Sequence, residues 1–163
     1  MAQISDASVQ EMLSRRYIAS LATENADGSI HIVAVWCYCD GERIYVATSS
    51  RSRKIQNLRR STKISLMVDS RDPAGQRGVT IAGAGQVLTG AAASEWNEKV
   101  HRKYLTAEAL ADPKVGPVFA QWDDVTIEIL PNSVIAWDMR EADRQFFGGA
   151  FHTHPEYWLP LEG

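Results

Sequence analysis

Two Asp-Gly dipeptides constrain the fold of this chain more than any other feature of its sequence. Asp27-Gly28 separates the segments 17–23 and 30–39, and Asp40-Gly41 separates 30–39 from 43–48. All three segments are rich in β-branched, aromatic or small apolar residues, which favours strands. Asp-Gly between two strands is typical of a tight hairpin turn. We therefore predict that the three segments form an antiparallel meander.

The remaining predicted elements do not follow the repeating strand–helix–strand order of a parallel α/β protein. Apolar spacing predicts helices at 6–15, 50–60 and 91–105. We expect further strands at 62–69, 79–90, 124–130 and 132–139, with a hairpin of the last two around Pro131-Asn132. Gly83 and Gly85 indicate a bulge or a tight corner in 79–90. These elements predict a six- to seven-stranded antiparallel β-barrel with flanking helices, mainly β or α+β in class.

The chain length favours one domain with its own core, which we place at residues 1–139. Residues 140–163 have no clear period but contain far more aromatic surface than a disordered end. We predict that this C-terminal tail packs on the barrel or on a partner subunit.

Charge and hydropathy exclude several classes of protein. The formal net charge of −3 argues against general nucleic-acid binding. No apolar run approaches the ~20 residues that span a bilayer, and the first residues carry acids without a basic leader segment. We expect a cytoplasmic protein that binds neither membrane nor nucleic acid.

No metal site or disulfide is expected. Cys37 and Cys39 are the only cysteines, and their spacing is poor for a disulfide. His152 and His154 alternate in the tail and could share a metal, but an exposed tail folded over the partner subunit is the favoured interpretation.

The segment ATSSRSRKIQNLRR (47–60) places cations where a helix usually starts with acids. A bound phosphate would explain this, because it accepts helix N–H groups and offsets the repulsion between Arg53 and Lys54. A solvated face is the alternative, and it suits Arg59 and Arg60. A nucleic-acid patch would need stacking aromatics, which this segment lacks. Hydroxyl donors nearby are Thr48, Ser49, Ser50 and Ser52.

The strand HIVAVWCY (31–38) is apolar on both faces. One face would fill the barrel, and the other requires a cover, which could be a second subunit or a flat ligand. Trp36 could equally be an ordinary core residue.

This strand, the Asp-Gly turn and IYVATSSRSRKIQNLRRSTKISLMVD resemble the pyridoxamine 5′-phosphate oxidase-like FMN-binding split-barrel family over residues 8–138. The most specific part runs through Thr48, Ser52, Arg53 and Lys54. The resemblance implies a split barrel, a homodimer and a cofactor groove between its subunits.

The resemblance also implies cofactor contacts. Arg53 and Lys54 fall where the family binds the FMN phosphate, and Ala47 and Thr48 fall where a strand end contacts the cofactor. Gly78 and Val79 fall near the edge of the ring. Ser49, Ser52 and Asn57 are further candidates for phosphate or structural contacts, and the segment lining the ring comprises Ile32, Val33, Ala34, Val35, Trp36 and Cys37.

The resemblance leaves the reaction less defined. The tail shows no Arg-x-His element for pyridoxamine phosphate, and Cys37 stands where the true oxidases often have Lys. We therefore expect an FMN-dependent oxidoreductase of the general reductase branch that acts on an unidentified small molecule. An F420-dependent reductase and a non-catalytic flavin carrier or sensor are the alternatives. No catalytic acid or base is identified, and His31 is interpreted as structural.

Overall fold

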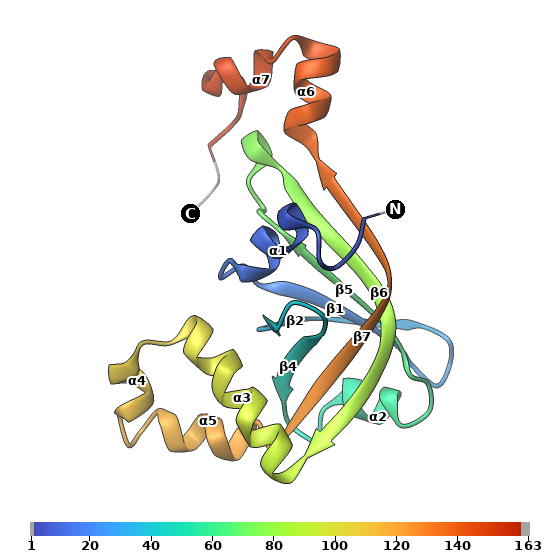
Figure 1. The fold of residues 1–163 in the computed structure, drawn as a ribbon, viewed down its shortest axis with the longest axis vertical. Helices are drawn as coiled ribbons and strands as arrows, with labels where there is room; N and C mark the ends of the chain where they lie inside the picture. The colour runs from blue at the N-terminus through green and yellow to red at the C-terminus, as the bar shows by residue number, and fades with distance from the viewer. Residues whose placement is uncertain (1, 161–163) are drawn as a thin grey trace.

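The computed structural model describes residues 2–160, and its centre is one antiparallel sheet of seven strands in the order β2-β1-β5-β6-β7-β4-β3. The predicted fold class is confirmed. Two strands, β6 and β7, run most of the length of the molecule (Figure 1). The strands are β1 (Ala19–Glu24), β2 (Ile30–Val35), β3 (Tyr38–Cys39), β4 (Ile44–Thr48), β5 (Lys63–Asp69), β6 (Arg77–Thr89) and β7 (Val125–Asp138).

The strand order makes the sheet curl. β2 and β3 lie at opposite ends of the order, yet only Trp36 and Cys37 separate them in the chain. The two edges of the sheet must therefore approach each other at these two residues, although β2 and β3 do not pair. This arrangement is a barrel left open along one seam.

Strand register separates the core from the outer face. Val33, Leu21, Leu66, Ile81 and Val134 lie side by side across β2, β1, β5, β6 and β7. Four of the five are buried, and Val33 packs against the core from its rim. Because side chains alternate along a strand, the neighbouring positions of each strand face outward.

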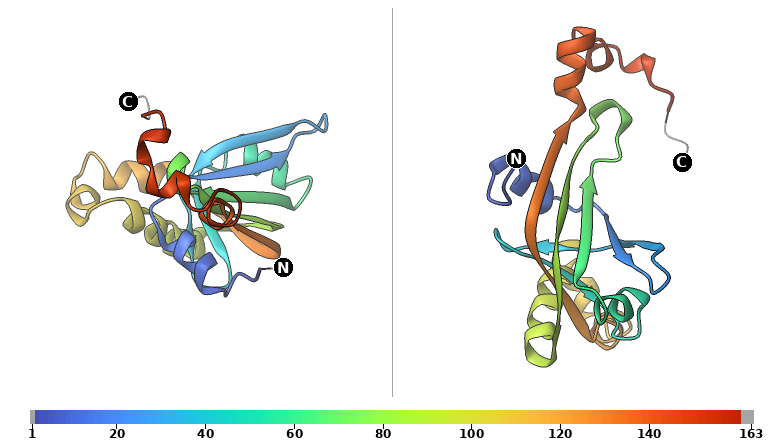
Figure 2. Two further views of the ribbon diagram at one scale, coloured as in Figure 1. Left: turned by 90° about the horizontal axis from the view of Figure 1, so that it is seen from above. Right: turned by 90° about the vertical axis from the view of Figure 1, so that its right-hand side faces the viewer.

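Helices lie at both ends of the sheet (Figures 1 and 2). α1 buries Val9, Met12 and Leu13 in the barrel core, at the spacing predicted from the sequence. The helices are α1 (Ala7–Ser14), α2 (Arg53–Leu58), α3 (Gly90–Tyr104), α4 (Ala107–Ala111), α5 (Gly116–Trp122), α6 (Met139–Phe147) and α7 (Ala150–Thr153), with 3-10 turns η1 (Pro73–Gly75) and η2 (Pro155–Tyr157).

The predicted hairpin around Pro131-Asn132 is wrong, because β7 is a single strand through these residues. The register between β6 and β7 shifts at Ala82/Gly83, so that Gly83 lies opposite Pro131. A bulge tolerates a proline that cannot donate to the ladder. This register shift confirms the bulge predicted from the glycines. Glycine is required there because a Cβ at Gly83 would lie 2.2 Å from the Leu130 carbonyl oxygen.

The predicted meander is also wrong in part. β1 pairs with β2, and β3 pairs with β4, but β4 continues the sheet through β7 rather than through β2. The segment 30–39 is therefore two strands on opposite edges. The basic helix predicted at 50–60 spans only Arg53–Leu58, so its macrodipole is weaker than the sequence argument assumed.

The C-terminal tail forms helices that the sequence did not predict. α6 and α7 extend beyond the ends of β6 and β7 (Figure 1). The Phe151 ring contacts the rings of both Phe147 and Trp158. The Asp143 carboxylate accepts hydrogen bonds from the backbone N–H groups of Phe151 and His152. Packing of the tail on a partner subunit stays a prediction, as does the domain boundary.

Residues 2–160 contain neither a membrane-spanning helix nor a cluster of metal-ligating side chains. No helix in this range is both long and apolar enough to cross a bilayer. Within the same range, no cluster of three His, Cys, Asp or Glu side chains is placed to hold a metal ion.

We predict that Leu66→Ala lowers the free energy of unfolding by about 2–5 kcal/mol, because Leu66 is fully buried at the centre of the core row. Urea unfolding at one protein concentration measures this. Leu159→Ala removes the same atoms from a side chain that is 90% exposed and should change little. Equal losses in the two variants would contradict the assigned core.

Candidate functional site

A groove lies where the seam of the barrel meets the start of α2. Its volume is about 520 Å³, and we call it the seam groove. The end of β2, the end of β4, α2 and α5 each contribute to it. Six residues predicted as cofactor contacts line the groove: Ala34, Val35, Trp36, Ala47, Thr48 and Lys54.

Trp36 forms an apolar wall of the seam groove, and two neighbouring aromatic rings hold it in place. Its ring stacks on Tyr104 at a centroid distance of 4.9 Å and on Phe119 at 5.5 Å. Parallel aromatic contacts of this kind add to the free energy gained from burial. Trp36 therefore joins the seam to α3 and α5 and is at once a packing residue and a groove residue.

Lys54 brings an unpaired positive charge into the seam groove. Its side chain is partly buried and makes no hydrogen bond or ion pair within residues 2–160. Burial lowers the pKa of Lys54, and the nearby Asp123 carboxylate opposes this shift. A partly desolvated ammonium without a partner is costly, so an anionic ligand in the groove would stabilise it.

Hydroxyl groups surround the start of α2. The Thr48 side chain is buried, and its Oγ1 lies 3.5 Å from Oγ of Ser52, the N-cap residue. Ser52 makes no side-chain capping bond, so the first N–H groups of α2 have no side-chain cap. Ser49 accepts a bond from the Arg51 N–H, whereas both donors of Ser50 bind Asp124 at the start of β7.

Arg53 faces a different hollow from Lys54. It lines a cavity of about 420 Å³ with residues of the β1–β2 turn and His31. The guanidinium is exposed and lowers the pKa of Asp27, whose hydrogen bonds to Ser29 have the larger effect. It makes no hydrogen bond in the described part of the chain. The structure thus places the two predicted phosphate ligands in separate cavities.

Other predicted contacts lie outside the seam groove. The buried Asn57 amide donates to Thr23 and Asn25, so it ties α2 to β1. Cys37 and Val79 are buried in the core, and Gly78 lies beneath the Trp137 ring. Val33 faces the barrel interior and Ile32 the outer face of β2. Six of the predicted contacts are brought together in the seam groove, whereas Gly78 and Val79 line a different hollow.

Ile18, Phe119 and Asp123 complete the lining of the seam groove, and the sequence analysis missed them. Ile18 precedes β1, while Phe119 and Asp123 belong to α5 and its C-cap. The sequence around α5 showed only the breaks at Asp112-Pro113 and Gly116-Pro117. No short-range signal indicates that this segment folds back over the seam.

Comparison with known proteins identifies the family. Residues 5–128 match the family model described as pyridoxamine 5′-phosphate oxidase. A comparison with curated proteins found no match.

Solved structures show the same fold. The conserved hypothetical protein Rv2991 from Mycobacterium tuberculosis is 26% identical, with a TM-score of 0.70, over 85% of this chain and 87% of that one. An F420 reductase is 22% identical, with a TM-score of 0.60, over 77% and 94%. HutZ, a heme storage protein from Vibrio cholerae, is 14% identical, with a TM-score of 0.60, over 80% and 93%. Because the family model covers most of its length, the chain belongs to the pyridoxamine 5′-phosphate oxidase family.

Proposed function

We propose that the chain binds FMN in the seam groove, at a homodimer interface, and transfers hydride or electrons to a small molecule. The observation that carries the proposal is the unpaired, partly buried ammonium of Lys54 beside an apolar wall. Such a groove suits a ligand with a flat ring at one end and an anion at the other.

The groove residues fit this ligand. A volume of about 520 Å³ lies within the ~300–1,000 Å³ of small-molecule and cofactor sites. Lys54 would bind the phosphate together with the Thr48 and Ser52 hydroxyls. Ala34, Val35 and Trp36 would orient the ring and exclude water on one side. FMN, when bound, supplies the hydride-transfer chemistry, and the protein supplies position and electrostatics.

Arg53 is proposed as a second phosphate ligand. It is exposed and unbonded, so its side chain is free to reorient at little cost. Its contribution should be smaller than that of Lys54, because an exposed cation is screened by water.

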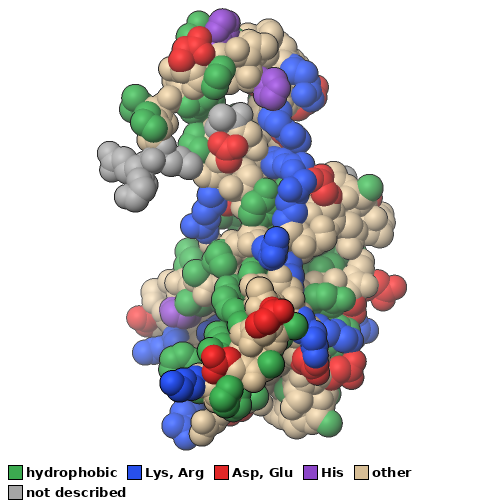
Figure 3. All heavy atoms as spheres, turned by 90° about the vertical axis from the view of Figure 1, so that its left-hand side faces the viewer, with side chains coloured by type: hydrophobic (Ala, Val, Ile, Leu, Met, Phe, Trp, Pro, Cys, Tyr) green, Lys and Arg blue, Asp and Glu red, His purple; other side chains and the backbone are tan. Residues whose placement is uncertain are grey.

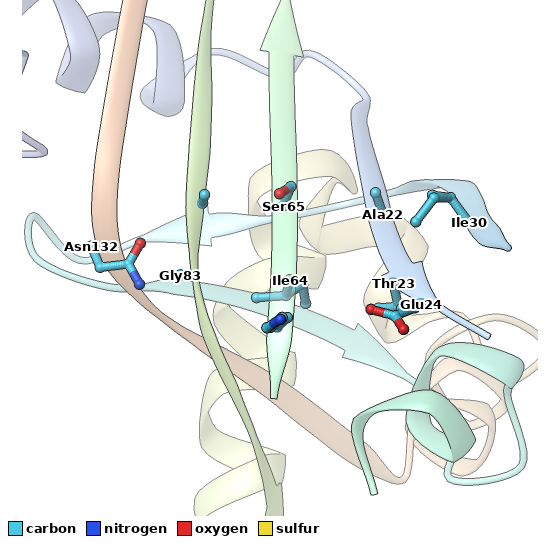
Figure 4. A pocket seen from close by; sticks show the side chains of 10 residues that line it. Ala22, Thr23, Glu24, Ile30, Ile64, Ser65, Gly83 and Asn132 are labelled. Atoms are coloured by element: carbon cyan, nitrogen blue, oxygen red, sulfur yellow. The ribbon is translucent and has the colours of Figure 1, made fainter. Parts of the chain in front are cut away.

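The outer face of the sheet supports the homodimer. Two rows cross the strands without a single charged residue. Ile32 and Ile135 in these rows are 66% and 58% exposed, which is costly for apolar side chains in a monomer. A shallow hollow of about 310 Å³ opens on this face beside Ala22 and Ser65 (Figure 4). The rows are Ala34, Ser20, Met67, Thr80 and Ile135, and Ile32, Ala22, Ser65, Ala82 and Ser133.

Nucleic acid is a poor candidate ligand. Figure 3 shows a narrow run of Lys and Arg side chains on the upper half of one face and mixed acidic and basic side chains below it, and the formal net charge of the chain is −3. A nucleic-acid surface is typically a broad basic patch on a basic domain, whereas this chain is acidic overall.

F420 is the alternative cofactor, since it would use the same anion site and flat wall, and an F420 reductase shares the fold. A non-catalytic carrier or sensor would use them too. The absorption spectrum of the purified protein and reduction of acceptors by a nicotinamide donor separate the three possibilities.

We predict that Lys54→Met weakens FMN binding at least tenfold and leaves riboflavin binding nearly unchanged, because a charge-assisted bond contributes about 1.5–3 kcal/mol and riboflavin lacks the phosphate. Flavin fluorescence titration measures both affinities. Arg53→Met should show a smaller loss, and Arg59→Met, which neutralises an exposed cation at the C-cap of the same helix, serves as the control. If Lys54→Met binds FMN as the unchanged protein does, the phosphate is bound elsewhere.

We predict that FMN affinity falls in alkaline solution before an ordinary lysine would lose its proton. Burial lowers the pKa of Lys54, so its positive charge is lost as pH rises through that lowered pKa, at a lower pH than for an exposed lysine. By linkage, FMN binding should raise that pKa and be accompanied by proton uptake in this pH range. Titration calorimetry in two buffers of different ionisation enthalpy measures the uptake, which should be absent in Lys54→Met.

We predict that Ile135→Asp converts the dimer to a monomer, because it places a charge at a 58% exposed apolar position of an uncharged row. Sedimentation velocity measures the change. Ala111→Asp introduces the same charge at an exposed residue of α4, which lines neither this face nor the seam groove, and should leave the dimer intact. A dimer that survives Ile135→Asp must use another surface.

A further inference from the structure

A row of buried polar side chains leads from β7 to the seam groove. Thr126 Oγ1 donates to Asn97 Oδ1 at 2.6 Å, and Asn97 Nδ2 donates to the Asp123 carbonyl oxygen at 2.6 Å. His101 Nε2 lies 2.7 Å from Asp123 Oδ2. Thr126, Asn97 and His101 are all at least 95% buried. The row therefore ends at Asp123, the only one of the four that lines the groove.

Burying three polar side chains is costly unless each finds a partner. Here the partners converge on one residue. The Asp123 backbone N–H also donates to the Phe119 carbonyl oxygen, so its amide, its carbonyl and one carboxylate oxygen are all fixed. A network in which every member is bonded holds its end point rigidly. Asp123 is thus presented to the groove in one orientation.

The second carboxylate oxygen of Asp123 is not used by the protein. Asp123 Oδ1 makes no hydrogen bond to any residue in the described range 2–160. Lys54 lines the same groove and is not within ion-pair distance of Asp123, because it forms no ion pair in that range. The groove therefore contains an ammonium and one unbonded carboxylate oxygen that form no direct ion pair, although the carboxylate favours the charged form of Lys54.

We propose that Asp123 is a specificity-determining residue that accepts hydrogen bonds from the hydroxyl or ring N–H groups of the ligand bound by Lys54. This proposal rests on the proposed function and names the chemistry of its ligand more closely. A ligand that satisfies both groups carries an anion at one end and hydrogen-bond donors further along. The polyol chain and ring N–H of a flavin nucleotide have this pattern, whereas a plain aromatic acid does not.

His101 has a positioning role in this arrangement. It is buried against the Phe119 ring, at a centroid distance of 5.1 Å, and lines a separate cavity of about 440 Å³ on the far side of Asp123. It therefore does not line the groove, and acts on a ligand there only by holding Asp123 Oδ2. The alternative is that the network merely anchors α5 and β7 to α3.

Riboflavin is the test ligand, because it has the polyol and ring but no phosphate for Asp123 to repel. We expect Asp123→Ala to weaken riboflavin binding at least tenfold and Asp123→Asn, which keeps an acceptor oxygen, to weaken it less. Glu98→Gln removes the same charge from an exposed residue of α3 and is the control. Fluorescence titration gives the affinities, and the melting temperature of each variant reports its folding.

Positioning by His101 is tested by rescue. His101→Leu should weaken riboflavin binding, and His101→Gln, which restores a donor to Asp123, should recover most of the affinity. A purely structural network would lower the melting temperature in both variants without this difference in affinity.

Three results would overturn the proposal. Equal riboflavin affinity in Asp123→Ala and the unchanged protein would show that Asp123 does not contact the ligand. Tighter binding of riboflavin in that variant would show that the carboxylate only obstructs the groove. With either of these two results, FMN binding that depends on Lys54 in the unchanged protein would still support the proposed function without the role of Asp123. Failure to bind any flavin or F420 would remove both proposals.

Discussion

The fold depends on how the chain crosses from one edge of the sheet to the other at Trp36 and Cys37. A break in the ladder leaves backbone groups without partners, and buried groups of this kind are costly. The end of α3 supplies the partners: the Tyr104 hydroxyl accepts from the Cys37 N–H and donates to the Tyr17 carbonyl, and Lys103 Nζ donates to the carbonyls of Cys37 and Leu13. Burial lowers the pKa of Lys103, yet its two carbonyl acceptors compensate for much of that cost.

The seam groove follows from this crossing. Where two strand edges approach without pairing, side chains rather than a ladder must fill the space, and here Trp36 does so between α3 and α5. The same crossing directs Ala34, Val35 and Trp36 toward the ends of β4 and α2. The open barrel and the groove of this chain therefore have one cause, the curl that brings the two sheet edges together without pairing them.

The sequence predicted what depends on neighbours in the chain. The strand composition of β1 and β5, the turns at Gly28 and Gly41 and the glycine of the bulge at Gly83 are local features, and the elements that they predict appear in the structure. Pairing between strands that are distant in the chain does not depend on local sequence, so the meander prediction did not identify β7 as a partner of β4. Pro131 was interpreted as a turn because the sequence cannot show that a bulge opposite it removes the need for its N–H. Asp123 was missed for the same reason, since its role arises only when α5 folds back over the seam.

The divergence of Arg53 and Lys54 shows why a motif does not specify a site. Successive residues of a helix differ by about 100° in direction, so adjacent cations on α2 face different cavities when the helix is short and its register is fixed. Ile55, Asn57 and Leu58 fix that register by burying one side of α2. Lys54 is then held beside the seam and partly desolvated, while Arg53 remains in solvent. The burial of the helix, rather than its dipole, selects which cation of the basic segment can act on a ligand in the groove.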